Sequence, residues 1–418
     1  MVGVAVGDAE ELVGVGSSLV VRERLEVFAG EVLAGAVNRP VQAFNGGLYL
    51  RGLLEGGMRK SLEPIVARLG AEADYHSLQQ FLADSPWDPV LVVKAVAERV
   101  APMIDVQAWV LDDTGFPKDG KGSPGVKRQY SGTLGKIGNC QIGVSLHAVG
   151  GLGTVPLGWA LYLPEEWCED SERRRKAKIP EEVSFQTKPE LGVELAKQAA
   201  GWDLPKAPVL GDQAYGDNTE LRESLQREGL QYVLAVGAET KVFAPGTAFT
   251  VPKRNGPPGR PATRPVADRD PVTIAQLVAG LDAEQWQTVS FRDGPNDGEP
   301  MTSRFAFVAV RAAHLWRKGL REVPREELLI AEWPPGAQTP TDYWLTNMPA
   351  NTEPECLARL ARLRWKIELD YKQLKGELGL DHYEGRSWLG WYHHTALVSA
   401  AHGFLTLERQ NPNRQRPA

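Results

Sequence analysis

The segment 364–380 reads RWKIELDYKQLKGELGL and predicts an amphipathic helix with one buried face. At about 100° per residue, its apolar side chains fall on a single stripe. The stripe consists of Leu363, Ile367, Tyr371, Leu374 and Leu378. Such a stripe packs against a large apolar surface, for example the face of a sheet. We therefore expect a core-facing helix here.

Three charged residues lie at the border of that buried face. With Arg364 at zero, Glu368 lies about 40° and Lys375 about 20° around the helix, whereas the apolar stripe centres near −60°. Asp370 and Glu377 point away from these three, at about −120° and −140°. A carboxylate at a core border suits a metal ligand or a general acid or base. An Arg–Glu pair at i, i+4 with a solvated lysine is the simpler explanation, and the helix alone favours it, so the rest of the chain must decide.

The composition is that of an ordinary globular protein. The chain has 418 residues, a formal net charge of −6 and three widely spaced cysteines, which fit neither a disulfide framework nor a zinc ribbon. No apolar run approaches the roughly 18 residues of a membrane span, and the N-terminus lacks the basic start of a signal peptide. We expect a cytoplasmic protein. The negative charge disfavours a protein that coats nucleic acid but allows local cationic clusters.

The N-terminal quarter of the chain predicts helices. Residues 1–20 show no period and should be disordered, whereas apolar residues in 21–104 recur at helical spacing. Ser85-Pro86-Trp87-Asp88 has the form of an N-cap followed by a proline at the first helical position. We expect an all-helical domain over 21–104. Its basic residues alternate with acids, which leaves DNA binding and plain packing equally open.

Strands begin at Val106, where the hydrophobic period changes. The expected elements are strands at 108–113, 141–149 and 155–163, a helix at 190–200, a strand at 207–212, a helix at 218–228 and a strand at 231–236. Three strands, helix, strand, helix and strand is the order of an RNase H-like mixed sheet with flanking helices. We assign residues 105–236 to the first part of such a core.

The remaining chain predicts a β-rich insertion and a return to helices. The insertion spans 237–350, with strands expected at 287–292, 304–310, 327–332 and 343–346. Residues 351–407 carry the helix described first and a second one at about 388–407. The tail 408–418 should be disordered. The fold class is thus α/β, with an RNase H-like sheet interrupted by the insertion and preceded by the helical domain.

Acidic residues end two of the predicted strands. Asp112 and Asp113 end the first, and only one of them can face a shared site because adjacent strand residues point to opposite sides. Asp212 ends the fourth strand and has no evident local role, whereas its neighbour Asp217 suits an N-cap. If the fold brings Asp113, Asp212 and Glu368 together, their mutual repulsion calls for a divalent cation with oxygen ligands, Mg²⁺ or Mn²⁺. Two such ions support in-line phosphoryl transfer.

These residues resemble those of bacterial insertion-sequence transposases of the DDE type. The third-acid helix of that group carries Tyr-x2-Arg-x3-Glu-x6-Lys, and here Ala361, Arg364, Glu368 and Lys375 occupy the four positions. The tyrosine is therefore replaced by alanine. Similar motifs extend the resemblance over roughly residues 40–405: DDTGFPKDGKGSPGVKRQYSG at 112–132, LPEEWCED at 163–170, GDQAYGD at 211–217 and GLDHYEGRSWLGWYHH at 379–394.

The resemblance implies a catalytic core in which Asp113, Asp212 and Glu368 bind two Mg²⁺ ions, with Mn²⁺ as a substitute. The family's first acid is followed by threonine, as Asp113 is by Thr114, which favours Asp113 over Asp112. The implied activity is hydrolysis at the ends of an insertion sequence, followed by joining of the 3′-hydroxyl to target DNA. The implied partners are double-stranded DNA and a second copy of the chain, in the bacterial cytoplasm with the nucleoid.

Several cations are candidate DNA contacts. Arg364 and Lys375 would hold backbone phosphates of the element's end. A group of cations follows the first acid in the sequence. Either a DNA-contacting loop or an exposed hairpin turn would explain this group. Its members are Lys118, Lys121, Lys127, Arg128 and Lys136. In the insertion, Gly259-Arg260-Pro261 resembles a minor-groove hook, although a disordered basic loop explains Arg260 as well.

Two other functions remain open from the sequence. A former transposase kept as a DNA-binding regulator would explain the loss of the tyrosine at Ala361. A hydrolase that uses two separated carboxylates without metal is the other alternative. The histidines of the last helix lack the spacing of a zinc pair, and no phosphate-binding P-loop motif is present, so ATP is not implied.

Overall fold

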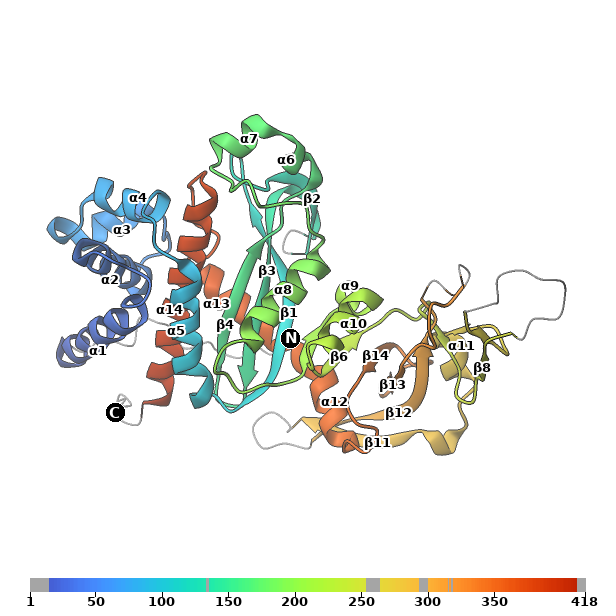
Figure 1. The fold of residues 1–418 in the computed structure, drawn as a ribbon. Coiled ribbons are helices and arrows are strands. Elements are labelled where there is room, and N and C mark those ends of the chain that lie inside the picture. Colours follow the sequence, from blue (N-terminus) through green and yellow to red (C-terminus); the bar gives the residue numbers. More distant parts are fainter. Residues whose placement is uncertain are drawn as a thin grey trace. The chain divides into compact units, whose positions relative to one another are not determined.

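The computed structural model describes residues 15–132, 135–252, 264–292, 300–314, 316 and 319–411 (Figure 1). The chain divides into two compact units. The first contains residues 1–107, 112–205 and 366–418, and the second contains 108–111 and 206–365. Strand β1 (Val106–Pro117) therefore contributes residues to both units.

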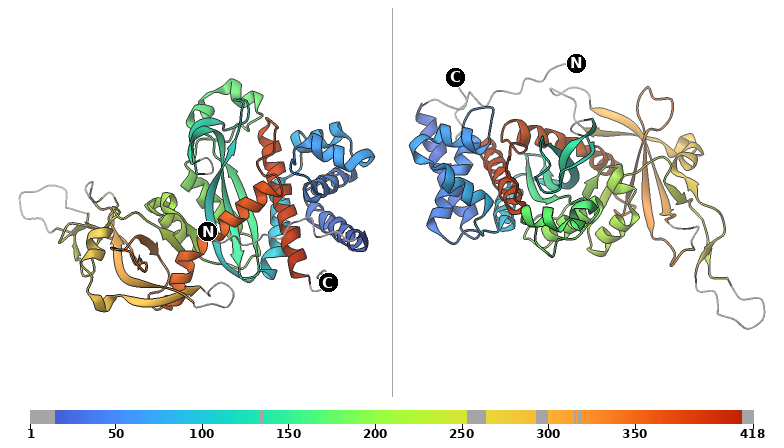
Figure 2. Two further views of the ribbon diagram at one scale, coloured as in Figure 1. Left: turned by 180° about the vertical axis from the view of Figure 1, so that it is seen from behind. Right: turned by 90° about the horizontal axis from the view of Figure 1, so that it is seen from above.

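Helices form the N-terminal part of the first unit, as the sequence predicted. They are α1 (Val15–Leu33), α2 (Pro40–Leu54), α3 (Leu62–Leu69), the 3-10 turn η2 (Gly70–Glu72), α4 (Tyr75–Ala83), α5 (Pro89–Val100) and the 3-10 turn η3 (Ala101–Met103). These helices pack around the long C-terminal helix α14 (Trp388–Gln410), drawn in red beside them in Figure 2. The cap expected at Ser85 is wrong, because Asp88 caps α5 by accepting a bond from the Val90 amide.

The sheet of the first unit is built on β3 (Lys136–Gly150), whose inner residues are buried. This strand pairs antiparallel with β2 (Lys127–Ser131) and β4 (Thr154–Leu161), and it neighbours β1. The helices of this part are α6 (Glu165–Glu169), α7 (Ser171–Lys176), α8 (Lys188–Ala200) and α13 (Lys366–Gly376). Helix α8 packs on β3 and β4, while α13 contacts β3.

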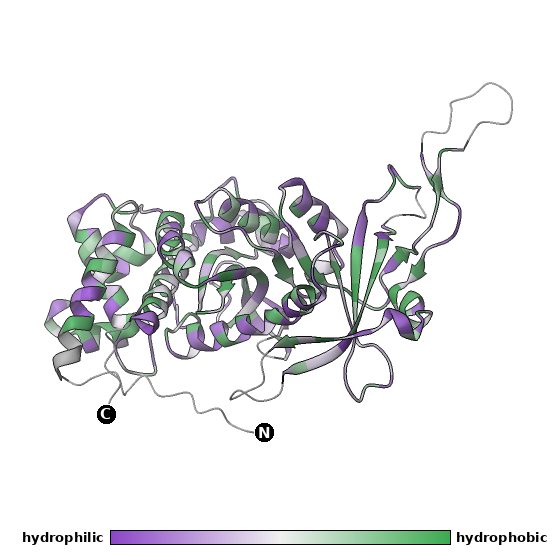
Figure 3. Ribbon diagram, turned by 90° about the horizontal axis from the view of Figure 1, so that it is seen from below, coloured by the Kyte–Doolittle hydropathy of each residue, from purple (hydrophilic) through white to green (hydrophobic). Residues whose placement is uncertain are grey.

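The sheet of the second unit joins the predicted core strands to those of the predicted insertion. Strand β5 (Val209–Gly211) runs parallel to residues 108–111 of β1 on one side and to β6 (Tyr232–Ala235) on the other. Strand β14 (Asp342–Thr346) then pairs antiparallel with β6. The inserted strands therefore continue the core sheet, and their apolar residues can be followed in Figure 3.

The remaining strands of the second unit include β13 (Glu326–Trp333), which pairs with β14. The further strands are β12 (Met301–Ala312), β11 (Gln287–Arg292), β7 (Lys241–Phe243), β10 (Val272–Thr273) and the separate pair β8 (Phe249–Thr250) and β9 (Val266–Ala267). The helices are α9 (Gln213–Gly216), α10 (Thr219–Arg227), α11 (Ile274–Ala279), α12 (Pro354–Arg362) and the 3-10 turns η4 (Ala283–Gln285) and η7 (Leu363–Trp365). Apolar strand residues such as Val310, Leu329 and Leu345 form its core.

The structure differs from the predicted elements in several places: β2 was not predicted, β3 begins at Lys136, and α14 extends to Gln410, into the tail that was expected to be disordered. Two further differences concern the candidate site. Strand β1 continues to Pro117, so Asp112 and Asp113 lie inside the strand and not at its end. The segment 364–380 is not one helix: the 3-10 turn η7 ends at Trp365, α13 ends at Gly376, and Gly379 follows with a left-handed φ of 68°. A left-handed glycine just beyond a helix is a common way to end it.

The fold class is confirmed as a mixed α/β sheet with flanking helices and a helical N-terminal region. The domain boundaries expected at residues 20, 104, 236, 350 and 407 stay a prediction, because compact units group residues by contact alone. Within the described residues, no helix combines the length and apolar character that crossing a bilayer requires.

Candidate active site

Asp113 lies in β1 with its carboxylate facing a lysine. The Lys188 ammonium is 3.0 Å from one carboxylate oxygen and 3.1 Å from the other, and the Asp113 side chain is 21% exposed. Lys188 begins α8, and the capping box of Thr187 and Glu190 holds the start of that helix in place. The ammonium group thus occupies a position between both oxygens where a cation can bind the carboxylate.

Asp112, the alternative first acid, has a different environment. Its side chain is buried, and its Oδ1 accepts a bond of 2.7 Å from the Asp113 amide. Burial, together with the charge of Asp112, raises the pKa of Tyr371, whose hydroxyl lies 2.8 Å from Ser145 Oγ. Asp113 is the more accessible carboxylate of the two.

Glu368 is an exposed residue in the first turn of α13, within the first unit. Asp370, two residues later, is buried. Its oxygens accept bonds of 2.9 Å from His147 and 2.6 Å from the Thr154 hydroxyl. Burial is the largest influence and would raise the pKa of Asp370, but the bonds from His147 and Thr154 and the charges of His147 and His402 together hold that pKa below its usual value. The helix acid nearest to Glu368 is therefore committed to packing against β3 and β4.

The surroundings of Asp370 include a second histidine. His402 Nε2 lies 3.9 Å from Asp370 Oδ1, beyond hydrogen-bond distance. Burial lowers the pKa of His402 to about 4. Among the described residues, His147 Nε2 and both ring nitrogens of His402 have no hydrogen-bond partner. This cluster is buried and only partly satisfied.

Lys375, a predicted phosphate contact, is turned toward the protein. Its ammonium donates a bond of 2.7 Å to the Gly115 carbonyl, two residues after Asp113, and lies 5.6 Å from the centre of the Phe116 ring. Burial lowers the pKa of Lys375 to about 8. Arg364 lies in η7, in the second unit. Phosphate binding by these two residues stays a prediction.

Asp212 lies in the second unit and caps a short helix. Its Oδ1 accepts bonds from the Ala214 and Tyr215 amides, at 2.9 and 3.4 Å, at the start of α9. The sequence-based statement that Asp212 has no local role is therefore wrong. Gly216 ends α9, and a Cβ there would lie 1.8 Å from the Ala235 carbonyl oxygen, so only glycine allows this approach to β6.

Asp217, expected to cap α10, does something else. Asn218 is the N-cap and accepts a bond from the Leu221 amide. Asp217 Oδ1 instead accepts bonds from the Gly237 amide and the Thr240 hydroxyl, at 2.9 and 2.6 Å. The expected cap is off by one residue, and Asp217 ties the loop after β5 to the first residues of the insertion.

A buried ion pair joins α10 to the inserted strands. Arg222 Nε donates a bond of 2.8 Å to Glu327 Oε1, and the Tyr232 hydroxyl donates to the same oxygen at 2.7 Å. Arg222 also donates to the Gly216 carbonyl and, at 3.2 Å, to the Thr219 hydroxyl. The helix that follows Asp212 is thereby fixed to β13 and β6.

The cations after Asp113 are divided between internal contacts and solvent. Lys118 donates to the Tyr383 carbonyl, and burial lowers its pKa to about 8. Lys127 pairs with Glu166 at 2.9 Å. Arg128 and Lys136 are exposed on the β2–β3 hairpin. Arg260 lies outside the described residues.

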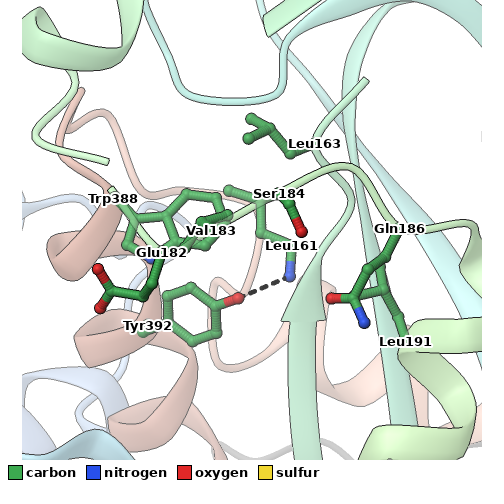
Figure 4. A pocket seen from close by; sticks show the side chains of 9 residues that line it. All are labelled: Leu161, Leu163, Glu182, Val183, Ser184, Gln186, Leu191, Trp388 and Tyr392. Carbon is green, nitrogen blue, oxygen red and sulfur yellow. Dashed lines mark hydrogen bonds between the residues drawn. The ribbon is translucent and has the colours of Figure 1, made fainter. Parts of the chain in front are cut away.

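A cavity of about 410 Å³ opens in the first unit between the end of β4, residues 182–186 and the start of α14 (Figure 4). The Tyr392 hydroxyl on its wall accepts a bond of 3.1 Å from the Leu161 amide. Its lining includes a single carboxylate, Glu182. One carboxylate supplies fewer oxygens than Mg²⁺ prefers, so this cavity is a poor metal site.

Sequence reasoning missed three partners near the predicted acids: Lys188, His147 and Arg222. The capping box before Lys188 predicts a helix start, but no local signal predicts its contact with Asp113, 75 residues away. The structure brings Lys188 and Lys375 close to Asp113, whereas Asp212 belongs to the other unit. Among the described residues, no three His, Cys, Asp or Glu side chains are grouped to hold a metal ion. The meeting of the three acids stays a prediction.

Comparison with known proteins shows a family match and a similar curated protein. Residues 33–298, more than half of the chain, match the sequence model of a family described as DDE superfamily endonuclease. Over 200 residues the chain is 29% identical to a probable transposase for insertion sequence element IS701 from Microchaete diplosiphon. That match covers 47% of this chain and 50% of the relative, so the chain spans about half the length of this curated protein. The family match includes Asp113 and Asp212 and ends before Glu368.

Proposed function

Because the chain belongs to the DDE superfamily of endonucleases, we propose that it is a DNA transposase that cuts at the ends of an insertion sequence and joins the 3′-hydroxyl to target DNA. The family match over 33–298 carries this proposal. The similarity to a probable insertion-sequence transposase supports it. Double-stranded DNA is the proposed substrate, and a homodimer the proposed working form.

The proposed metal ligands are Asp113, Asp212 and Glu368. Their donor chemistry fits Mg²⁺ or Mn²⁺, which prefer carboxylate oxygens. Three observations support the fit: Lys188 bridges both oxygens of Asp113, Glu368 is exposed, and Asp212 uses only Oδ1 within the described part of the chain. Two bound ions would supply an activated attacking oxygen and stabilise the leaving oxygen of an in-line displacement.

The residues around these acids have proposed roles of their own. Lys188 balances the charge of Asp113 and would move away when a cation replaces it. Arg364, Lys375, Lys127, Arg128, Lys136 and Arg260 are the proposed phosphate contacts. Lys375 already donates a hydrogen bond to the Gly115 carbonyl, and Lys127 pairs with Glu166.

Substitution of the three acids tests the proposal directly. We expect Asp113→Asn, Asp212→Asn and Glu368→Gln each to lower cleavage of end-containing DNA at least about 100-fold, because metal stabilisation of the transition state is worth several kcal/mol. Inverted repeats flanking the gene would provide the substrate. Binding of the same DNA should survive. Glu377→Gln, an exposed carboxylate just beyond α13, is the matched control and should cut normally. Any acid variant that cuts at the wild-type rate removes that residue from the site.

A catalytically impaired DNA-binding regulator is the second candidate. Ala361 favours it, because this position is 7% exposed within α12 and presents no group to a substrate. Mn²⁺-dependent nicking of end DNA by the purified chain would contradict the regulator. Loss of that nicking with EDTA and its return with Mg²⁺ would contradict a metal-independent hydrolase.

A further inference from the structure

The β2–β3 hairpin presents two large apolar side chains to solvent. Tyr130 is 64% exposed and Ile137 is 58% exposed. The strand register places Tyr130 directly opposite Ile137, so the two side chains lie next to each other on one face of the hairpin. Arg128 lies on the same face, two residues before Tyr130. The pair is therefore accessible to a partner on this face of the hairpin.

The charge around this pair indicates a polyanionic partner. Residues 120–147 contain four cations and no acid. Lys127 is neutralised by Glu166. Arg128 forms no ion pair with the described residues and lies on the face of Tyr130 and Ile137, whereas Lys136 points to the opposite face of the hairpin. An apolar contact with a cation beside it on the same face matches a nucleobase and a neighbouring phosphate.

The size of the apolar contact also favours a base over a protein. Two partly exposed side chains offer on the order of 200 Å². A stable protein interface buries roughly 800 Å² on each partner, several times more. A base or base step needs only one or two side chains, as in apolar wedges and stacking platforms.

The end of the hairpin opposite its turn is tied to the segment that follows β1, the strand of Asp113. Asn139 donates to the Lys118 and Gly120 carbonyls, at 2.6 and 2.9 Å, which ties β3 to the segment after β1. Burial raises the pKa of Cys140, whose thiol also lies within the influence of Lys188 and Asp113. Ile137 is three residues from Cys140, or roughly 10 Å along a strand.

We propose that the β2–β3 hairpin packs Tyr130 and Ile137 against unpaired bases of the DNA strand that is cut at Asp113. Arg128, on the same face, holds a neighbouring phosphate. This inference rests on the proposed function, because it places the DNA strand at Asp113. Stacking on an aromatic ring tolerates any base, so the contact holds the strand without reading its sequence.

The test measures binding of the full-length protein to a mixed-sequence duplex with a single-stranded 3′ extension that carries a fluorescent base analogue. EDTA is present, so no cleavage occurs. The wild-type protein should quench the analogue. Tyr130→Ala should lose the quenching and about tenfold in affinity, and Ile137→Ala somewhat less, whereas Tyr130→Phe should behave as wild type. Leu152→Ala, 66% exposed between β4 and the other end of β3, is the matched control.

Each outcome decides the matter. Wild-type quenching and affinity in Tyr130→Ala would overturn the stacking role. Weakened self-association in that variant, with DNA binding unchanged, would identify a protein interface and also overturn it. Because Tyr130 is exposed, an unchanged thermal unfolding midpoint would show that the variant folds. Retained quenching with normal cleavage by the acid variants would overturn the proposed function alone.

Discussion

Two buried ionic clusters, one in each unit, differ in how fully their charges are satisfied. In the second unit, Arg222 is 1% exposed and donates to Glu327, Gly216 and Thr219. In the first unit, Asp370 is bonded to His147 and Thr154, while the outer nitrogen of His147 has no partner among the described residues. The guanidinium is permanently charged and divides its donors among several elements, whereas the histidine holds its charge only when protonated.

The comparison suggests that the two units secure the proposed ligands differently. The arginine cluster grips the end of α9, the helix that Asp212 caps, with a charge that no ordinary pH removes. The histidine cluster anchors α13 two residues after Glu368. Breaking a buried pair costs more than the pair contributes, because the remaining charge is left uncompensated. The arginine cluster should therefore be the more sensitive to substitution.

The largest effect is expected for Arg222→Met. The change leaves the Glu327 carboxylate buried without its cation, so the free energy of unfolding should fall by about 3 to 5 kcal/mol. Urea unfolding followed by circular dichroism measures it. Arg227→Met, at the exposed end of the same helix, is the control and should change stability by less than about 0.5 kcal/mol. A loss below about 1 kcal/mol for Arg222→Met would remove the distinction between the clusters.

A smaller effect is expected for Asp370→Asn. The amide keeps the size of the side chain and can still accept from Thr154, so the loss should be about 2 to 3 kcal/mol. The same unfolding experiment measures it, with Glu377→Gln as an exposed control beyond the same helix. If Asp370→Asn were more damaging than Arg222→Met, the order of the two clusters would be reversed.

The smallest expected effect is a change in the free energy of unfolding with pH. It comes from a buried histidine that belongs to neither cluster. His394 has Tyr49 Oη at 2.9 Å and the Gly379 carbonyl at 3.0 Å, and burial lowers its pKa to about 4 from a usual 6.5. Between these values the unfolded chain binds a proton that the folded chain does not. Stability from this group is therefore complete above pH 6.5 and is lost as the pH falls toward 4.

We expect this loss to be about 2 kcal/mol between pH 7 and pH 5. The measurement is the difference in unfolding free energy between the two pH values, for the wild type and for His394→Gln. The variant should be less stable at pH 7 and show a smaller pH dependence. Equal pH dependence in both proteins would show that His394 is not held neutral by burial.

The alternating and helical patterns predicted most elements of the fold, because burial imposes those periods locally. The expected strand 287–292 matches β11, and 343–346 matches β14 except for one residue. The angular positions predicted for residues 364–380 on a single α-helix are wrong for the first residues of the segment. A residue of a 3-10 turn advances by about 120°, not about 100°, so the turn η7 breaks the angular relation between Arg364 and Glu368.

The identities of the three acids came from motif spacing, whereas their environments could not be predicted. The contact between Asp113 and Lys188 joins residues 75 positions apart, and the bond between His147 and Asp370 spans 223 positions. Neither produces a periodic signal. The capping role of Asp212 was missed for a different reason. Its helix α9 has four residues, which are too few to produce a helical pattern in the sequence.

Strand β14 of the inserted segment is hydrogen-bonded to the core strand β6. In the second unit, β6 has β5 on one side and β14 on the other, so no backbone edge is open along it. A chain without the insertion would leave the outer amides of β6 unpaired, which invites pairing with other molecules. The insertion therefore cannot be lost in the way a surface loop is lost. It also protects the core strand next to the Asp212 loop from aggregation.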